Sequence, residues 1–397
     1  MKGLGFLSRE LRELEARGLR RKMRLLSSAP GPRAVVDGRE VLVLCSNDYL
    51  GLAAHPGVAR AAVAAVAEWG TGATASRLIA GNLEPHLRLE EAAARFLRTE
   101  SALLFPTGTQ ANLGALTALA GPGTVVFSDA LNHASVIDGI RLSGAERRIY
   151  PHRDAAALEA LLRKSRRAPR RLIASDSLFS MDGDLADLPR LLELAEEHDA
   201  LLYLDEAHAL GTLGPGGRGA LEHFRIRPRD HADRLVVMAG LGKAMGSAGG
   251  VVAGSRELAD YLANRARGFV FSTGPPPPVA AAGREALRIS ASDEGVRLRR
   301  RLRRNGEVWK RGLEGAGADT RPSETHIVPV SVGDARRAVA LSRRLLRGGL
   351  FIQAIRPPSV PPGTSRLRSA PTAAHSGADI EEALELFEAA WTGSQSP

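Results

Sequence analysis

The sequence predicts an α/β protein with a mainly parallel sheet in a large domain, followed by a smaller α/β domain. Short runs rich in Val, Ile and Leu alternate with helical patterns along residues 124–255. These runs are almost continuously apolar, which is typical of parallel strands covered on both faces. The pattern changes after "STGPPPPVAAA" at 272–282. We therefore expect an N-terminal helix with short strands over 1–50, a large domain over 51–282 and a small C-terminal domain over 283–397.

Each expected element follows from a local pattern. The N-terminus, "MKGLGFLSRELRELEARGLRRKMR", has the composition of a charged helix. The apolar runs predict strands at 124–129, 171–176, 200–208, 234–240 and 249–255, with a helix over 185–198. In the small domain a long charged helix ends near Leu313, and strand-like runs follow at 326–332 and 350–355. A final helix is expected from about Ala378.

Composition limits the class of protein. With 397 residues and 44% hydrophobic content, the chain is long enough to bury a large core. No apolar run approaches the ~20 residues of a membrane span, and the N-terminus lacks a signal-peptide core. The single cysteine, Cys45, excludes an internal disulfide and a multi-cysteine metal site. We expect a cytoplasmic protein with no metal and no membrane partner.

The net charge of +10 leaves two interpretations besides nucleic-acid binding. The basic residues are mostly arginines spread along the chain, and the densest run, "RLRRRLRRNGEVWKR" at 297–311, has no interleaved aromatic platform. A solvated helix face is the simpler explanation. A basic rim that attracts an acidic substrate or carrier is the other. Nucleic acid is not an expected partner.

Polar side chains follow four of the predicted strands. Asp129 and His133 follow the first run, Asp176 and Ser180 the second. The run at 200–208 ends with Asp205, Glu206 and His208, and the next is followed by a lone lysine, Lys243, among small residues. Any one of these groups could simply cap a helix. In an open parallel sheet, however, ligands bind at the carboxyl ends of the strands, where all four groups would converge.

These residue types suit a cofactor with a pyridine ring, an aldehyde and a phosphate. The aldehyde needs a lysine that binds it covalently, and the ring nitrogen needs a carboxylate that keeps it protonated. The ring needs a flat side chain to stack on, and the phosphate needs backbone amides at a helix start. Gly108 and Thr109, in "FPTGTQANLGALTALA", supply such a start. The small residues around Lys243 would leave space for a flat ring.

The chain resembles the α-oxoamine synthases, pyridoxal 5'-phosphate (PLP) enzymes of the fold-type I aminotransferase group. The resemblance runs over nearly the whole chain and includes "CSNDYLGL", "SRLIAGNLEPHLRLE", "NHASVIDG", "FSMDGD", "LDEAHALGTLGPGGRG" and "FSTGPPPP". It implies a mainly parallel seven-stranded sheet in the large, PLP-binding domain. The segment "AIRPPSVPPGTSRLR" is most similar to the branch that acts in biotin biosynthesis.

The resemblance also implies roles for single residues. Lys243 would bind the cofactor aldehyde, Asp205 would pair with the pyridinium nitrogen, His208 would hydrogen-bond the phenolic oxygen and His133 would stack on the ring. Further cofactor contacts are implied for Gly108, Thr109, Ser180, Ser272 and Thr273. Substrate contacts are implied for Asn47 and Arg368 at the amino-acid carboxylate, for Arg20 or Arg21 at the acyl donor, and for Ser76 and Ser359.

The activity implied is a decarboxylative condensation of L-alanine with a pimeloyl thioester, which gives 8-amino-7-oxononanoate, carbon dioxide and free thiol. The donor could be pimeloyl-CoA or pimeloyl-acyl carrier protein, and the family forms homodimers. A related synthase with another amino acid or acyl chain remains an alternative, as does a PLP-binding protein without catalysis. Gly240 replaces a threonine that often contacts the phosphate, and Thr109 replaces a frequent aromatic residue.

Overall fold

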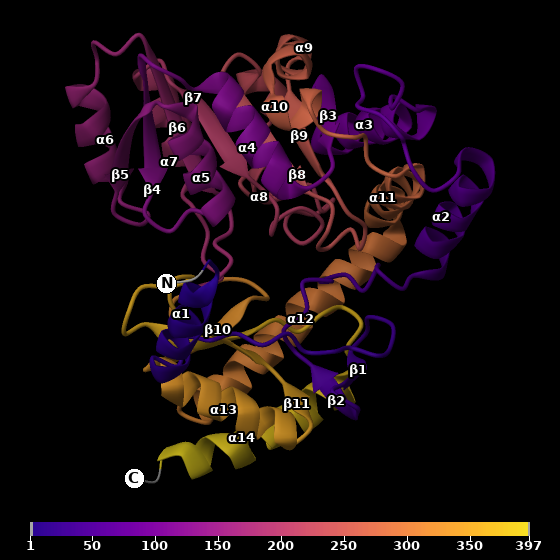
Figure 1. Cartoon of the computed structure of the whole chain (residues 1–397), viewed down its shortest axis with the longest axis vertical. Helices are drawn as coiled ribbons and strands as arrows, with labels where there is room; N and C mark the ends of the chain where they lie inside the picture. Colours follow the sequence, from indigo (N-terminus) through magenta and orange to yellow (C-terminus); the bar gives the residue numbers. More distant parts are fainter. Residues whose placement is uncertain (1–2, 396–397) are drawn as a thin grey trace. The chain divides into compact units, whose positions relative to one another are not determined.

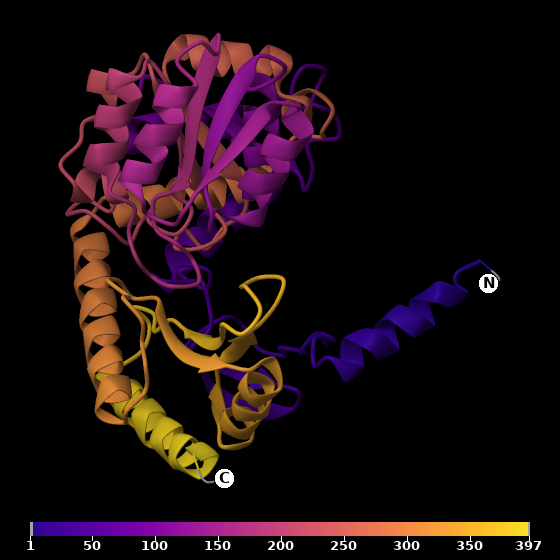
Figure 2. The same cartoon turned by 90° about the vertical axis from the view of Figure 1, so that its left-hand side faces the viewer.

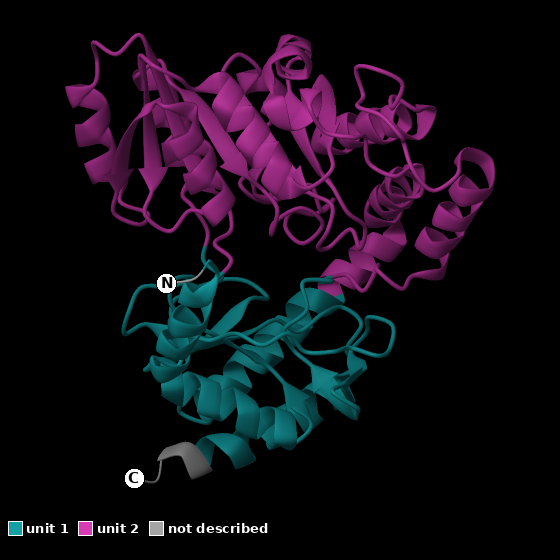
Figure 3. Cartoon of the chain, viewed as in Figure 1, with its two compact units in different colours: residues 1–49, 181–184, 301–397 teal, residues 50–180, 185–300 magenta. Residues whose placement is uncertain are grey.

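The computed structural model describes residues 3–395 and divides into two compact units (Figure 3). Unit 2 comprises residues 50–180 and 185–300, and unit 1 comprises residues 1–49, 181–184 and 301–397. The N-terminal segment and the C-terminal region, which the sequence suggested as separate regions, therefore share one unit. Backbone pairing joins them, because β2 (Arg39–Val43) runs parallel to β11 (Leu350–Phe351).

Unit 2 is built on a seven-stranded sheet with the order β3-β9-β8-β7-β6-β4-β5 (Figure 1). Its strands are β3 (Ser101–Phe105), β4 (Thr124–Asp129), β5 (Glu146–Tyr150), β6 (Arg170–Asp176), β7 (Leu201–Asp205), β8 (Leu235–Gly240) and β9 (Gly250–Gly254). The pairs from β5 to β8 are parallel, and β9 is antiparallel to both of its neighbours. The predicted α/β fold with a mainly parallel sheet is confirmed.

The apolar runs located five of these strands to within a few residues. β4, β6, β7 and β8 are buried along most of their length, which explains their continuous apolar sequences. The strands β3 and β5 were not predicted. β5 reads "ERRIY" and lies at the sheet edge with only Tyr150 buried, so it lacks the apolar signal of a central strand.

Helices lie on both sides of this sheet (Figure 2). They are α2 (Pro56–Trp69), α3 (Glu84–Leu97), α4 (Gly108–Leu119), α5 (Ala134–Ser143), α6 (Ala155–Lys164), α7 (Leu188–Glu197), α8 (Ala220–His223), α9 (Arg256–Arg265), α10 (Arg267–Val270) and α11 (Pro277–Ser290), with a short 3-10 helix at Pro228–His231. The side chain of Thr107 caps α4 by accepting from the amide of Gln110. Ala111, Ala115 and Leu116 of α4 then pack into the main core beside Phe105.

Unit 1 contains two three-stranded sheets. In the first, β1 (Arg33–Val36) and β11 flank β2; in the second, β10 (Val328–Gly333) and β12 (Gln353–Ile355) flank β13 (Ser365–Ser369). The run predicted as one strand at 350–355 is therefore split, because β11 and β12 pair in different sheets on either side of Ile352.

Helices α13 (Ala335–Arg347) and α14 (Gly377–Gln395) pack against these sheets, and α12 (Asp293–Gly315) contains the unit boundary at residue 300. The indole of Trp309 is fully buried in this core and donates to Ser369 Oγ at 2.7 Å. The N-terminal helix α1 (Gly5–Ala16) has no buried residue, and its Leu7, Leu11 and Leu14 side chains are exposed. Among residues 3–395, no helix has the length and apolar character needed to cross a membrane.

A buried ion pair fixes α3 against the sheet of unit 2. The two terminal guanidinium nitrogens of Arg77, Nη1 and Nη2, donate to the Glu90 carboxylate at 3.0 Å. Glu90 also accepts from the Leu104 amide on β3 at 2.7 Å. Arg77 and Glu90 are both buried. Such a pair need not be more stable than apolar packing, but removing one partner leaves an uncompensated buried charge.

We expect Glu90→Ala to lower the free energy of unfolding by about 3–5 kcal/mol, because Nη1 and Nη2 of Arg77 and the Leu104 amide lose their carboxylate acceptor. Urea unfolding followed by circular dichroism measures the change. The neighbouring Glu91→Ala is the matched control, since Glu91 is exposed and pairs only loosely with Arg95. Equal losses in the two variants would contradict a structural role for the buried pair.

Candidate active site

Three buried carboxylates end neighbouring parallel strands. β4 ends at Asp129, β6 at Asp176 and β7 at Asp205, and Asp176 lies directly opposite Asp205 in the ladder. Lys243 follows the end of β8 by three residues and is half-buried. The strand ends that the sequence analysis singled out are thus brought to one edge of the sheet.

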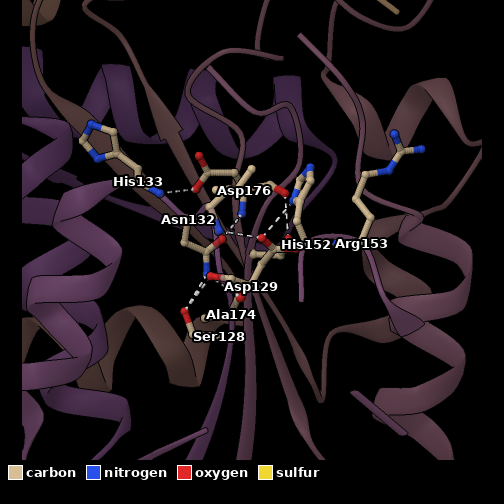
Figure 4. A network of polar contacts seen from close by, with 10 residues as sticks. Ser128, Asp129, Asn132, His133, His152, Arg153, Ala174 and Asp176 are labelled. Atoms are coloured by element: carbon tan, nitrogen blue, oxygen red, sulfur yellow. Dashed lines mark hydrogen bonds and ion pairs between the residues drawn. The ribbon is translucent and has the colours of Figure 1, made fainter. Parts of the chain in front are cut away.

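A hydrogen-bond network joins the ends of β4 and β6 (Figure 4). The side chain of Asn132 donates to Ser128 Oγ and to the Ala174 carbonyl, and its Oδ1 accepts from the Asp176 amide at 2.9 Å. Asp129 accepts from the His152 ring at 2.9 Å. The network holds the loop after β4 so that the His133 amide donates to Asp176 Oδ1 at 3.2 Å.

The carboxylates of Asp176 and Asp205 lie opposite each other, so they would repel if both were ionised. Burial and the neighbouring Asp205 carboxylate raise the pKa of Asp176 well above its usual range. Asp205 is the better hydrogen-bond acceptor of the pair: Asn112 Nδ2 donates to its Oδ2 at 2.8 Å, and the Ala207 amide donates to its Oδ1 at 2.9 Å. Two N–H donors therefore face the Asp205 carboxylate, while the raised pKa of Asp176 favours the protonated form of Asp176.

His133 presents a neutral imidazole ring beside these carboxylates. Desolvation lowers the pKa of His133, and the Lys243 ammonium acts in the same direction, while Asp205 opposes them. The amide of Ser135 donates to His133 Nδ1 at 3.2 Å, so Nδ1 is an acceptor and the ring proton belongs on Nε2. Part of the side chain is exposed, which leaves the ring accessible to a flat ligand.

The small residues around Lys243 are also required by packing. A Cβ on Gly246, whose φ is +59°, would lie 2.3 Å from the Ala53 amide nitrogen. A Cβ on Gly240 would lie 3.1 Å from the Ala207 Cβ. The segment 240–246 around Lys243 therefore packs closely on its neighbours at both ends. This packing is a second reason for its small residues, besides the space for a ring inferred from the sequence.

The start of α4 offers backbone amides to an anion. The first N–H groups of a helix have no partner within the helix, and Thr107 caps only the Gln110 amide, so those of Gly108 and Thr109 remain available. Gly250 lets β9 approach this turn, because a Cβ there would lie 2.7 Å from the Gly108 Cα. Ser272 lies beside the same turn and accepts from Gln110 Nε2 at 3.0 Å.

The remaining predicted residues of unit 2 fall into two places. Thr273 forms an isolated bridge with Ser76, so these two residues lie together. Ser180 and His208 are both buried in the turns that follow β6 and β7.

In unit 1, Tyr49 connects two residues predicted to bind substrate, Arg368 and Asn47. Arg368 on β13 donates to the Tyr49 hydroxyl at 2.9 Å, and that hydroxyl donates to Asn47 Oδ1 at 3.0 Å. His326 packs edge-on against the Tyr49 ring with 4.2 Å between ring centroids. Burial, together with the Arg368 charge, lowers the pKa of His326 to about 3, so His326 is neutral and adds no second positive charge.

The structure separates the two N-terminal arginines. Arg21 Nη2 donates to the carbonyls of Arg356 and Pro357 at 3.4 and 3.3 Å and to Ser359 Oγ at 3.5 Å. Arg20 instead pairs with Glu15 at 3.4 Å, and only its backbone carbonyl contacts Arg356. Arg21 and Ser359, both predicted from the sequence, therefore lie together, whereas the Arg20 side chain lies elsewhere.

Comparison with known proteins places this geometry in a family. A model described as aminotransferase class I and II matches residues 39–387. The chain belongs to the aminotransferase class I and II family.

Relatives of this aminotransferase-family chain cover almost its full length. It is 51% identical to an 8-amino-7-oxononanoate synthase of Geobacter sulfurreducens over 94% of this chain and 95% of that protein. It is 44% identical to a synthase of the same name from Thermoanaerobacter pseudethanolicus over 97% and 96%. Among solved structures, a lysine-to-alanine variant of serine palmitoyltransferase from S. paucimobilis with a bound PLP–myriocin aldimine is similar, with a TM-score of 0.92, 30% identity and 98% coverage of both chains.

Several residues that hold the site together were not singled out in the sequence. Asn112 contacts Asp205, and Ser135 contacts His133. Tyr49 lies between Arg368 and Asn47. Of these residues, only Asn112 could have been noticed in the sequence. It lies in the apolar helix "ANLGALTAL", where an asparagine has poor helix propensity and its amide needs hydrogen-bond partners.

Glu206, next to Asp205, is fully buried and receives the amides of Ala220 and Leu221 at 2.9 and 3.2 Å. Burial nevertheless dominates and raises the pKa of Glu206 from 4.5 to about 7. A group whose pKa is higher in the folded state stabilises the fold in its protonated form, so its contribution is lost as the pH rises through that range.

A glutamine at this position cannot ionise, so Glu206→Gln escapes this loss. We therefore expect the free energy of unfolding of Glu206→Gln, minus that of the unsubstituted protein, to increase by about 3 kcal/mol as the pH rises from 4.5 to above 7. Urea unfolding curves at several pH values measure this difference. The exposed Glu257→Gln controls for the loss of one carboxylate from the surface. Parallel stability curves for Glu206→Gln and the unsubstituted protein would show that Glu206 does not titrate in this range.

Proposed function

We propose that the chain is a PLP-dependent α-oxoamine synthase that condenses L-alanine with a pimeloyl thioester. The products are 8-amino-7-oxononanoate, carbon dioxide and the free thiol, and the reaction serves biotin biosynthesis. The observation that carries this proposal is the grouping of Lys243, Asp205 and His133 at the strand ends of a chain with near-full-length similarity to synthases of that name.

The residues present suit PLP. Asp205, buried and held by two N–H donors, would hold the proton on the ring nitrogen, and the accessible ring of His133 would stack on the cofactor. Lys243 would bind the aldehyde, and the amides of Gly108 and Thr109 would hold the phosphate. His208, Ser180, Ser272 and Thr273 would complete the cofactor contacts. When bound, PLP supplies a ring that withdraws electrons from the Cα of the amino acid.

Side chains of the protein would then accept and hold the protons of the reaction. Lys243 Nζ would accept the proton from the Cα of alanine, a step that requires its amine to have lost its own extra proton first. Asp205 would keep the ring nitrogen protonated throughout, because its two donors and the neutral Asp176 favour its ionised form. The neutral His133 would cover the ring without adding a positive charge, and its fixed Nδ1 acceptor holds the plane of the imidazole.

Residues of unit 1 would bind the substrates. For the amino-acid carboxylate we propose Arg368, with Asn47 and Tyr49 fixing its guanidinium. The neutral state of His326 leaves Arg368 as the positive charge of this cluster. For the acyl donor we propose Arg21 and Ser359, supported by their contact, and we assign Ser76 to the substrate side on the sequence resemblance alone.

We also propose a homodimer. The support is exposed apolar surface, on α1 at Leu7 and Leu11 and around α2 at Val63 and Val66, which a second copy could cover. The cytoplasmic location inferred from the sequence stays a prediction, as does the choice between CoA and a carrier protein as the bearer of the acyl group.

A second synthase activity is supported by one observation. The structure matches serine palmitoyltransferase with a TM-score of 0.92 but a Francisella tularensis 8-amino-7-oxononanoate synthase with only 0.75. Sequence favours the first proposal, since identity is 51% to a named synthase of the oxononanoate type and 30% to serine palmitoyltransferase.

We expect the purified protein to form 8-amino-7-oxononanoate from alanine and pimeloyl-CoA, and Lys243→Ala to lose on the order of 10³-fold or more in turnover. Mass spectrometry identifies the product, and borohydride reduction followed by peptide mapping identifies the cofactor lysine. The chain has only five lysines, so the assignment is unambiguous, and Lys164→Ala is the control. Labelling at another lysine would overturn the site, and turnover only with serine and a long-chain acyl-CoA would favour the second activity.

We expect Arg21→Glu to raise the KM for pimeloyl-CoA about 10-fold at low salt, with a smaller effect at high salt. Alanine binding, read from the visible spectrum of the bound cofactor, should change little. Arg20→Glu is the matched control, since the Arg20 side chain pairs with Glu15 and not with residues 356–359. Equal KM values for the two variants would remove the distinction between these arginines.

A further inference from the structure

Asn112 occupies the centre of a buried hydrogen-bond network in unit 2. Its side chain is 1% exposed and makes three hydrogen bonds. Nδ2 donates to Asp205 Oδ2 and to Ser135 Oγ, both at 2.8 Å, and Oδ1 accepts from the Tyr203 hydroxyl at 2.7 Å. All of its polar capacity except one acceptor position is therefore used.

The donors and acceptors fix the direction of every bond. An ionised Asp205 can only accept, so Nδ2 and not Oδ1 must face it, and the Tyr203 hydroxyl must donate to Oδ1. Ser135 Oγ accepts from Asn112, which frees the Ser135 hydroxyl proton for His133 Nδ1 at 2.7 Å. One amide thereby connects Tyr203, Asp205, Ser135 and His133.

We propose that Asn112 is a positioning residue for the cofactor: its amide holds Asp205 and, through Ser135, orients His133. This inference rests on the proposed function, because it assigns Asp205 and His133 to the two sides of the PLP ring. Asn112 acts through these two residues. Its one side chain fixes both Asp205, at the ring nitrogen, and His133, on the ring face.

The alternative is that Asn112 only fills space in α4. The two roles predict different effects of substitution on PLP affinity. If Asn112 only fills space, its substitutions should lower stability and leave the Kd for PLP unchanged. If its donor matters, Asn112→Ala should weaken PLP binding and Asn112→Asp should weaken it further, because a second carboxylate would lie where Nδ2 now lies, 2.8 Å from Asp205.

The positioning role also predicts a pH signature. Two carboxylates that close together share one proton at low pH and repel each other once it is lost. The other titratable groups that act on this position are His133 before α5, Asp176 on β6, Lys243 after β8, and Tyr203 and Glu206 on β7. These groups are the same in both variants, so the difference between the Asp and Ala variants isolates the added carboxylate.

The experiment titrates the cofactor-free protein with PLP and measures the Kd from the visible absorption band. We expect Asn112→Ala to weaken binding about 10-fold, since a charge-assisted hydrogen bond is lost. Asn112→Asp should bind more weakly than Asn112→Ala at about pH 8.5 and recover toward it at about pH 6. Tyr203→Phe, which removes only the donor to Asn112 Oδ1, should weaken binding a few-fold, and it tests the network if the Asp variant does not fold.

Asn305→Ala is the matched control, because Asn305 is also buried and its Nδ2 donates only to the carbonyls of Thr372 and His375. It should lower stability but leave the PLP Kd unchanged. Tighter binding by Asn112→Asp than by Asn112→Ala at both pH values, or unchanged Kd in all Asn112 and Tyr203 variants, would overturn the positioning role. An unsubstituted protein that does not bind PLP at Lys243 would instead overturn the proposed function itself.

Discussion

The candidate site of unit 2 depends on how the buried carboxylate of Asp205 is held in a dry interior. A carboxylate can stay ionised there only if donors replace the water it has lost. Asn112 and the Ala207 amide supply those donors, and the pKa of the facing Asp176 is raised so that it does not compete. The parallel register sets Asp176 opposite Asp205, and hydrogen bonds through Asn112 and Ser135 connect the tautomer of His133 to the same carboxylate.

In unit 1 the buried charge is positive and belongs to Arg368. The buried guanidinium of Arg368 needs acceptors and neutral neighbours. The Tyr49 hydroxyl accepts from it, and His326 remains uncharged because burial and Arg368 itself lower its pKa to about 3. In both units a single charge is therefore retained by hydrogen bonds, while an adjacent titratable side chain is held neutral. In the proposed function, each charge would face a ligand group of opposite sign.

The sequence predicted what depends on apolar periodicity and on the rule that ligands bind at parallel strand ends. This covers β4, β6, β7, β8 and β9 and the polar residues that follow the first four. It missed β3 and β5; β5 is an edge strand with one buried residue, so it carries no apolar run. It also merged β11 with β12, because hydropathy does not change where the chain passes from one sheet to the other. Nor could it predict that Asn112 contacts Asp205, since that contact joins a helix to a strand 93 positions away.

The departures from the α-oxoamine synthase pattern can be understood in the same physical terms. A threonine often stands where this chain has Gly240, and any Cβ at that position would press on the Ala207 Cβ at 3.1 Å. The Ala207 amide is one of the two donors to Asp205. A side chain at 240 is thus coupled to the carboxylate through Ala207, and it could add a hydroxyl only by shifting the residue that holds the charge. The glycine leaves that donor undisturbed. In the proposed function, the phosphate contacts would then depend more on the backbone amides at the start of α4, where Gly250 permits the close approach of β9.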